Sequence, residues 1–155
     1  MPVDELEPFK VARSINIMGV KHAVITSVDR DDIKDGGSII WAETVNAIRD
    51  LNPNTTIETL IPDFKGETDN IDRIIKVAPE VVSHNLETVR RLTKEVRIQA
   101  KYDRSLEVLK YLKESGISRT KSGVMLGLGE KREEVLETLD DLRSVGVDIV
   151  TLGQY

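Results

Sequence analysis

Short runs of β-branched residues alternate with amphipathic helical patterns along the whole chain, and this alternation constrains the fold more than any other feature. A strand, a helix and a further strand in succession predict parallel pairing through right-handed crossovers, and therefore an α/β fold. The expected strands cover residues 23–27, 56–61, 80–84, 120–126 and 147–152. The expected helices cover residues 4–18, 38–51, 67–78, 103–115 and 131–144.

The composition predicts a single globular domain over residues 1–155 and excludes several kinds of site. The chain has 22 basic and 27 acidic residues, and its net charge of −5 disfavours nucleic acid as a partner. It has no cysteine, which excludes disulfides, thiolate zinc sites, a cysteine nucleophile and a cysteine-ligated iron–sulfur cluster, and its two histidines exclude a three-histidine metal site. The sequence shows neither a membrane-spanning run nor a signal-peptide pattern, so a cytoplasmic protein without membrane contact is expected.

Parallel α/β folds bind ligands beyond the carboxyl ends of their strands, so the residues after each expected strand are the candidates for chemistry. Three carboxylates, those of Asp29, Asp31 and Asp32, follow the first strand. They could hold a hard cation such as Mg²⁺. Alternatively, they belong to a solvated loop in which Ser38 caps the next helix.

A second polar cluster, His84-Asn85-Leu86-Glu87-Thr88, follows the third expected strand. A neutral His84 together with Asn85 and Glu87 could bind the amine, carboxylate or hydroxyl groups of a small ligand. Alternatively, Asn85 caps a helix that begins at this point. The sequence leaves these two interpretations open.

Lys121 lies within an apolar strand, where a lysine is seldom buried without a partner. It could form a Schiff base, pair with a ligand carboxylate, or reach water at an open strand end. The motifs of a P-loop and of a dinucleotide fingerprint are both incomplete in the segment that follows. Its glycines are therefore interpreted as letting a flat ligand approach the backbone closely. The glycines are Gly123, Gly127 and Gly129, and they are followed by Glu130 and the next expected helix.

As a set, these segments resemble the lipoyl synthase family of radical S-adenosylmethionine enzymes. The resemblance runs in order from near residue 8 to the last residue. Each segment alone is a modest match, but their combination is highly specific. The matching segments are residues 18–32, 35–37, 61–64 with Gly66, 84–89, 96–97, 120–130 and 151–155.

The resemblance implies a partial (β/α) TIM-like barrel of about five parallel strands that holds S-adenosylmethionine at the strand carboxyl ends. In the family, a [4Fe–4S] cluster cleaves this cofactor to a 5′-deoxyadenosyl radical, which abstracts hydrogen from carbons 6 and 8 of a protein-bound octanoyl chain. An auxiliary cluster then donates two sulfur atoms. The cofactor-binding residues implied by position are Ser27, Asp29, Asn85, Glu87, Arg97, Lys121, Gly123, Gly127, Glu130 and Gln154.

The resemblance also implies a role for each group of residues. Residues 27–29, with Asn85 and Glu87, would approach the methionine and ribose parts of the cofactor. Arg97 and Lys121 would supply positive charge near its carboxylate. The segment from 123 to 130 would lie beside the adenine, with Gln154 facing the same pocket from the last strand.

The sequence departs from the family in the residues that hold the clusters. The family's Cys-x3-Cys-x2-Cys motif, its auxiliary-cluster cysteines and its Arg-Ser-Ser-Tyr signature do not occur here. The chain therefore resembles the cysteine-free middle of a lipoyl synthase, as a truncated gene product, an expressed piece or one part of a split enzyme. No catalytic residue or metal ligand is assigned within it, and the chain alone is expected to be inactive. The implied partners are an octanoylated lipoyl-carrier domain and a cluster-bearing chain.

Two alternatives remain. The chain could be a non-catalytic module that binds S-adenosylmethionine or completes a partner's barrel. It could instead be a barrel aldolase that uses Lys121 as its Schiff-base nucleophile, with Asp29 or Glu87 as acid or base. In the fragment interpretation, the strands near 23–25 and 147–150 have open edges, so the isolated chain is expected to self-associate.

Overall fold

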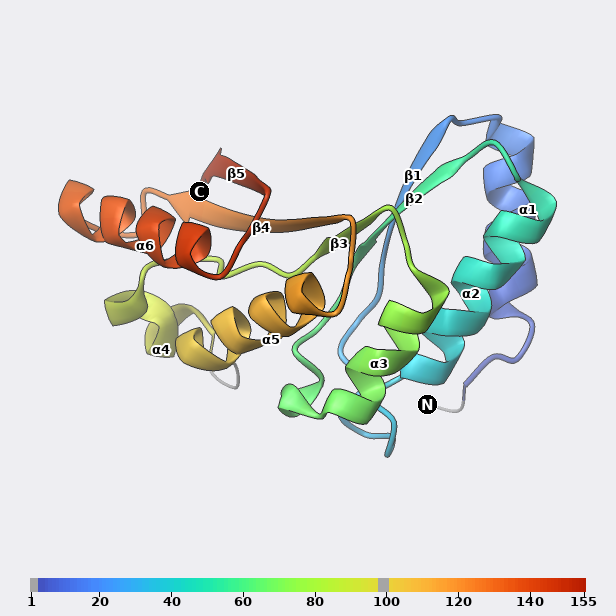
Figure 1. The fold of residues 1–155 in the computed structure, drawn as a ribbon, viewed down its shortest axis with the longest axis horizontal. Coiled ribbons are helices and arrows are strands. Elements are labelled where there is room, and N and C mark those ends of the chain that lie inside the picture. Colours follow the sequence, from blue (N-terminus) through green and yellow to red (C-terminus); the bar gives the residue numbers. More distant parts are fainter. Residues whose placement is uncertain (1–2, 98–100) are drawn as a thin grey trace.

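The computed structural model describes residues 3–97 and 101–155, which form one curved parallel sheet with helices packed against one face (Figure 1). The five strands of this sheet pair in sequence order, and each pair is parallel. The α/β fold and the five-stranded parallel sheet expected from the sequence are therefore confirmed. The strands are β1 (His22–Thr26), β2 (Thr56–Leu60), β3 (Val81–Ser83), β4 (Arg119–Leu126) and β5 (Ile149–Gln154).

The long helices lie close to where the hydrophobic periodicity predicts them. They are α1 (Glu7–Met18), α2 (Ser38–Leu51), α3 (Thr68–Val77), α5 (Tyr102–Glu114) and α6 (Arg132–Ser144). Three further elements are too short to show a helical periodicity and were not predicted. These are η1 (Phe64–Gly66), η2 (Arg90–Leu92) and α4 (Thr93–Val96). Within the described part of the chain, no helix is both long enough and apolar enough to cross a membrane.

The hydrophobic core lies between the sheet and its helices. Val45 and Ile48 lie one turn apart on α2 and pack with Ile57 of β2, while Val82 of β3 packs with Ile74 of α3. All five side chains are completely buried. Burying an aliphatic side chain of this size contributes about 1.5–3 kcal/mol. This layer therefore fixes the helices against the sheet, and with them the loops that follow each strand.

The opposite face of the sheet is open. Successive side chains of a strand point to opposite faces, so Ala23 of β1 is buried against the helices whereas Val24 is 58% exposed. The outer strands of the described sheet are β1 and β5, and Leu152 of β5 is 51% exposed. Parallel strands in complete folds are covered on both faces. The arrangement is that of a partial barrel, as the family resemblance implies.

The polar loop between β1 and α2 differs from the prediction in one detail. Ser38 is the first residue of α2 and not its cap, which is Gly37 with a φ of 82°. The carboxylate of Asp35 accepts the backbone N–H of Ile39 (2.9 Å) and stabilises the helix start instead. The buried Ser38 hydroxyl donates to Asn70 Oδ1 (3.1 Å) and joins α2 to α3.

Candidate ligand-binding site

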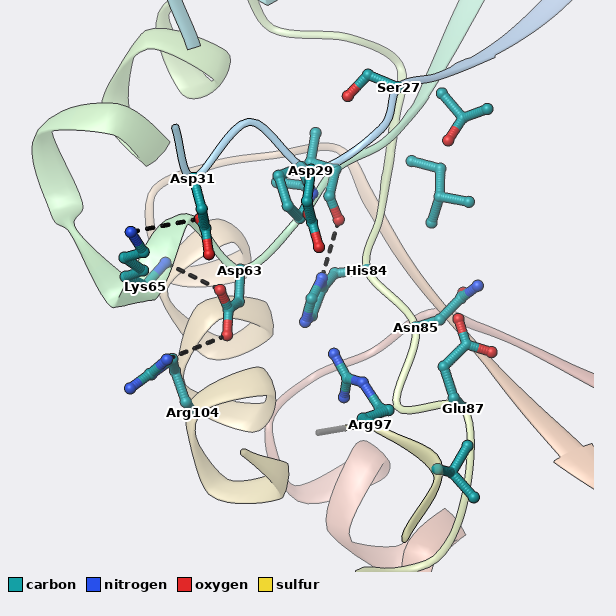
Figure 2. A pocket seen from close by; sticks show the side chains of 15 residues that line it. Ser27, Asp29, Asp31, Asp63, Lys65, His84, Asn85, Glu87, Arg97 and Arg104 are labelled. Atoms are coloured by element: carbon teal, nitrogen blue, oxygen red, sulfur yellow. Dashed lines mark hydrogen bonds and ion pairs between the residues drawn. The ribbon is translucent and has the colours of Figure 1, made fainter. Parts of the chain in front are cut away.

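A cavity of about 730 Å³ opens at the carboxyl ends of β1, β2 and β3. Its place agrees with the rule that parallel α/β folds bind ligands beyond the carboxyl ends of their strands. Its volume is within the range of small-molecule sites, about 300–1,000 Å³. Figure 2 shows acidic and basic side chains around the same cavity. Its charged lining residues are Asp29, Asp31, Asp63, Lys65, Glu87, Arg97 and Arg104.

Of the ten residues that the resemblance assigns to cofactor binding, five line this cavity. They are Ser27, Asp29, Asn85, Glu87 and Arg97. The other five lie on β4, on the loop after it and on β5, outside the cavity lining, and the role of all ten in cofactor binding remains a prediction. They are Lys121, Gly123, Gly127, Glu130 and Gln154.

Asn85 and Glu87 are positioned by backbone that continues from β3 alongside β4. The backbone N–H of Gly123 donates to Asn85 Oδ1 (2.9 Å), and the N–H of Glu87 donates to the Gly123 carbonyl oxygen (3.0 Å). Glu87 has a φ of 66°, a left-handed conformation that costs a non-glycine residue about 1–3 kcal/mol. A further bond from the N–H of Met125 to the Glu87 carbonyl oxygen (2.8 Å) holds this conformation. No helix begins at Asn85, so its interpretation as a helix cap is wrong.

Gly123 is required by the close approach of Asn85. A Cβ atom at position 123 would lie 2.9 Å from Asn85 Oδ1 and 3.2 Å from Thr151 Oγ1. Cβ atoms in proteins essentially never lie as close as the first distance to another atom. The sequence interpretation assigned the space at this glycine to a ligand, but in the structure the Asn85 amide fills it.

Arg97 follows α4 and lines the cavity (Figure 2). Its Nη1 donates to Ser105 Oγ (3.0 Å) and to the Leu86 carbonyl oxygen (3.3 Å). Burial lowers the pKa of the Arg97 guanidinium from its usual value, and nearby carboxylates, that of Glu87 foremost, oppose this shift. An arginine remains charged at neutral pH in any case. The cavity therefore contains a half-buried positive charge close to acidic side chains.

His84 contributes to the cavity wall but offers no free polar atom. Its ring is 2% exposed, with Nδ1 2.9 Å from the Ile61 carbonyl oxygen and Nε2 2.8 Å from Ser105 Oγ. Burial lowers the pKa of His84 from 6.5 to about 4, so the ring is neutral at pH 7. Because both ring nitrogens are bonded within the protein, the structure does not favour His84 as a ligand-binding group.

The acidic residues after β1 do not form a metal site. Asp31 lies 3.6 Å from Lys65 Nζ, and Asp32 forms an ion pair with Arg30 (2.7 Å). Across residues 3–97 and 101–155, no group of three or more histidine, aspartate or glutamate side chains is arranged to hold a metal ion. The Mg²⁺ interpretation is not supported. Asp29 and Asp31 instead contribute negative charge to the cavity.

The loop after β2 forms a charged wall that the sequence analysis did not assign to binding. Phe64 and Lys65 have φ values of 46° and 56°, two successive left-handed residues. Asp63 stabilises this turn, because its Oδ1 accepts the Lys65 N–H (2.9 Å) while its Oδ2 lies 3.5 Å from Arg104 Nη1. Such strained backbone is often found at functional sites. The available sequence signal was the Pro62-Asp63 pair directly after a strand.

Lys121 lies on the open face of the sheet and forms an ion pair there. Its Nζ is 2.8 Å from Glu58 Oε1, and Glu58 Oε2 is 3.5 Å from His22 Nε2. The Glu58 side chain is 8% exposed, so its carboxylate requires a nearby cation. The amine of a Schiff-base lysine must be free to approach a carbonyl carbon, whereas Lys121 Nζ is held by the Glu58 carboxylate. The aldolase alternative is therefore not favoured.

The loop after β4 is organised by Glu130. One carboxylate oxygen accepts the N–H of Gly127 (2.7 Å), and the other accepts the N–H of Leu128 (2.9 Å). These bonds, that of Gly127 foremost, lower the pKa of the Glu130 carboxyl from its usual value. Gln154 of β5 pairs in register with Leu126 at the end of β4, next to this loop. The glycine-rich segment is thus held in one conformation by the protein itself.

Solved structures of low sequence identity share this fold. HydG, a maturase of the [FeFe]-hydrogenase, matches with a TM-score of 0.79 and 17% identity over 99% of this chain and 36% of its own. Methylornithine synthase (PylB) matches with a TM-score of 0.74 and 12% identity over 100% of this chain and 45% of its own. Coproporphyrinogen III oxidase (HemN) from Escherichia coli, described as a radical SAM enzyme, matches with a TM-score of 0.68 and 14% identity over 96% of this chain and 38% of its own. These similarities establish the fold alone.

The sequence comparisons establish the family. The model of the radical SAM superfamily matches residues 2–142, and the chain belongs to this superfamily. Within it, the chain is similar to lipoyl synthases over nearly its whole length, which confirms the resemblance stated from the sequence. It is 75% identical over 153 residues to the lipoyl synthase of Christiangramia forsetii and 76% identical over 153 residues to the mitochondrial lipoyl synthase of Nematostella vectensis. Each alignment covers 99% of this chain but 52% and 53% of those relatives, so the chain spans about half their length.

The cavity is chemically suited to S-adenosylmethionine, whereas the chain is not suited to an iron–sulfur cluster. The cofactor carries a carboxylate, an amine, a sulfonium and ribose hydroxyls. Arg97 brings a positive charge to the cavity, Glu87 and Asp29 bring hydrogen-bond acceptors, and the Asn85 amide adds a polar group. A [4Fe–4S] cluster needs thiolate ligands, and the sequence has no cysteine.

Proposed function

We propose that this chain is the cofactor-binding part of a lipoyl synthase and that it binds S-adenosylmethionine in the cavity at the ends of β1, β2 and β3. The observation that carries the proposal is that Arg97, Glu87 and Asp29 line the same cavity. A ligand with a carboxylate beside an amine and a sulfonium needs one cationic and at least one anionic partner. The 75% identity to a lipoyl synthase supports this assignment.

In this proposal, Arg97 pairs with the methionine carboxylate through its guanidinium, which suits bidentate binding of a carboxylate. Glu87 and Asp29 accept hydrogen bonds from the amine and from ribose hydroxyls. Asn85 and Ser27 add polar contacts at the same end of the cavity. The fixed position of Glu87, held by two backbone bonds to β4, lowers the entropic cost of forming these contacts.

The adenine would lie against residues 123–130, with Gln154 beside it. The N–H groups of Gly127 and Leu128 are already bonded to Glu130, so this loop would bind by shape and by its remaining backbone groups. Lys121 would act through its charge from the open face of the sheet. These residues do not line the cavity, and their part in binding is proposed from the family resemblance.

Bound S-adenosylmethionine supplies a 5′-deoxyadenosyl radical when it is reductively cleaved. The residues of this chain bind the methionine and adenosine parts and thereby fix the position of the sulfonium. The electron and the sulfur atoms need cluster ligands that this cysteine-free sequence does not contain. We therefore propose that cysteines outside this sequence supply them, that residues 1–155 fold as one domain, and that an octanoylated lipoyl-carrier domain is the acceptor. A cytoplasmic location is proposed as well, although the relative from Nematostella vectensis is named mitochondrial.

Titration of the chain with S-adenosylmethionine, followed by NMR chemical shifts, tests the proposal. A dissociation constant of about 1 mM, or about −4 kcal/mol, is expected because a cluster iron would otherwise add a strong anchor. Glu87→Ala should weaken binding about threefold or more. Glu43→Ala makes the same change at an exposed position of α2 and should not affect binding. Micromolar binding that Glu87→Ala leaves unchanged, or no binding at about 10 mM, contradicts the proposal.

A further inference from the structure

A chain of four hydrogen-bonded polar groups runs from the core to the cavity. It starts at the carbonyl oxygen of Ile61, which accepts a hydrogen bond and cannot donate one. His84 Nδ1, 2.9 Å away, must therefore carry the ring proton. In a neutral ring, Nε2 is then an acceptor, and its partner at 2.8 Å is the hydroxyl of Ser105. The surroundings of His84 thus fix its tautomer.

The tautomer of His84 in turn fixes the direction of the Ser105 hydroxyl. Ser105 is completely buried and has one hydroxyl proton, which it donates to His84 Nε2. Its oxygen lone pairs remain free to accept, and they face Arg97 Nη1 at 3.0 Å. A serine without the histidine could turn its proton toward the guanidinium, which would be repulsive. With the histidine in place, the oxygen presents an acceptor to Arg97.

Arg97 is therefore held at one of its three nitrogens. The two hydrogens of Nη1 are used by Ser105 Oγ and by the Leu86 carbonyl oxygen. Within residues 3–97 and 101–155, no hydrogen bond or ion pair involves Nε or Nη2 of Arg97. These two nitrogens form the edge of a guanidinium that matches a carboxylate in a bidentate pair. Holding Nη1 leaves that edge available to the cavity.

We propose that Ser105, together with His84, positions Arg97 to recognise the carboxylate of the ligand. Neither residue donates to or accepts from the ligand itself. Ser105 acts through Arg97, and His84 acts through Ser105. The proposal rests on the function proposed above, and it adds a residue on α5 that lies outside the cavity lining and outside every motif singled out in the sequence.

The experiment compares two ligands that differ in the carboxylate alone, S-adenosylmethionine and decarboxylated S-adenosylmethionine. The wild-type chain should bind the first about tenfold more tightly, as expected for one charge-assisted pair. Ser105→Ala should reduce this preference to about twofold, with little effect on the decarboxylated ligand. In an Arg97→Ala background, Ser105→Ala should have no further effect on the preference, because the two residues act as one unit.

Ser38→Ala is the matched control. Ser38 is also completely buried, accepts from an arginine (Arg73 Nη1, 2.9 Å) and donates to a side-chain acceptor, but away from the cavity. It should lower the unfolding temperature about as much as Ser105→Ala and leave the carboxylate preference unchanged. The inference, but not the proposed function, is overturned if Ser105→Ala leaves the carboxylate preference unchanged. It is also overturned if Ser105→Ala lowers this preference equally in the wild-type and Arg97→Ala backgrounds. Failure of the wild-type chain to bind S-adenosylmethionine overturns the proposed function and the inference with it.

Discussion

The buried imidazole of His84 should make the stability of this protein depend on pH in a defined window. Burial is the largest cause that lowers the pKa of His84 from 6.5 to about 4, and the positive charge of Arg97 acts in the same direction. The unfolded chain, in which the ring meets water, takes up its proton near pH 6.5. Between pH 6.5 and about 4 the unfolded state therefore binds more protons than the native state. In this window the free energy of unfolding must fall as the pH falls.

The size of the effect follows from the shift. Each pKa unit corresponds to about 1.4 kcal/mol, so the fall from 6.5 to about 4 is worth about 3 kcal/mol in total. Most of this should be lost between pH 7 and pH 4.5. Carboxyl groups with lowered pKa values, such as Glu134 at about 2 beside Arg91, destabilise the protein at lower pH as they take up protons. Because unfolded carboxyl groups take up protons mainly below about pH 5, the range from pH 7 to about 5 reports mainly His84.

Urea unfolding followed by circular dichroism at pH steps from 7.5 to 4.5 measures this dependence. His84→Gln retains a donor and an acceptor but cannot titrate, so its free energy of unfolding should be nearly constant over the window. A slope that persists in His84→Gln would refute the assignment of a buried, neutral His84.

Three further outcomes are expected. Gly123→Ala should destabilise the chain by about 1–3 kcal/mol in urea unfolding, because the new Cβ would lie 2.9 Å from Asn85 Oδ1. Gly153→Ala, where a Cβ meets nothing within 4 Å, should be nearly neutral, and equal costs would contradict this reasoning. Anaerobic reconstitution with iron and sulfide should give no specific cluster. A stoichiometric absorption near about 400 nm that survives desalting would contradict this expectation. Light scattering over a concentration series should show species larger than 17.4 kDa, and Val24→Lys on the exposed edge strand should reduce them. A monomer at every concentration would show that the open edges do not drive association.

The sequence was sufficient to predict the order and type of the main elements. Strands and long helices were identifiable because each is long enough to show its hydrophobic period, as in α2, where Val45 and Ile48 share the buried stripe. The segment between β3 and α5 could not be assigned in this way, because η2 and α4 span three and four residues. Their positions depend on tertiary contacts, including the ion pair between Arg91 of η2 and Glu134 of α6 (2.7 Å).

The site was predicted less completely, because its pairings join residues that are distant in sequence. Lys121 was recognised as a buried-strand lysine that needs a partner, but Glu58 lies 63 residues before it. The register of β2, β3 and β4 brings Glu58 and Lys121 close together in the sheet. Similarly, nothing in the sequence relates Ser105 to His84, since their contact depends on the packing of α5 against the sheet. Composition and spacing identify residue types for a site, whereas strand register decides which of them meet.

The cluster after β3 shows how one short motif serves both the core and the cavity. In extended backbone, successive side chains point to opposite sides. His84 and Leu86 accordingly are buried, with exposures of 2% and 0%, and His84 reaches the cavity only as part of its wall, while the polar side chains of Asn85 and Glu87 line it. The left-handed conformation of Glu87 ends this alternation, and at this residue the chain pairs with Val124 of β4. Substitutions within the same motif should therefore differ in kind. Loss of His84 should act mainly on stability and its pH dependence, whereas loss of Glu87 should act mainly on ligand affinity, because its carboxylate makes no ion pair among the described residues.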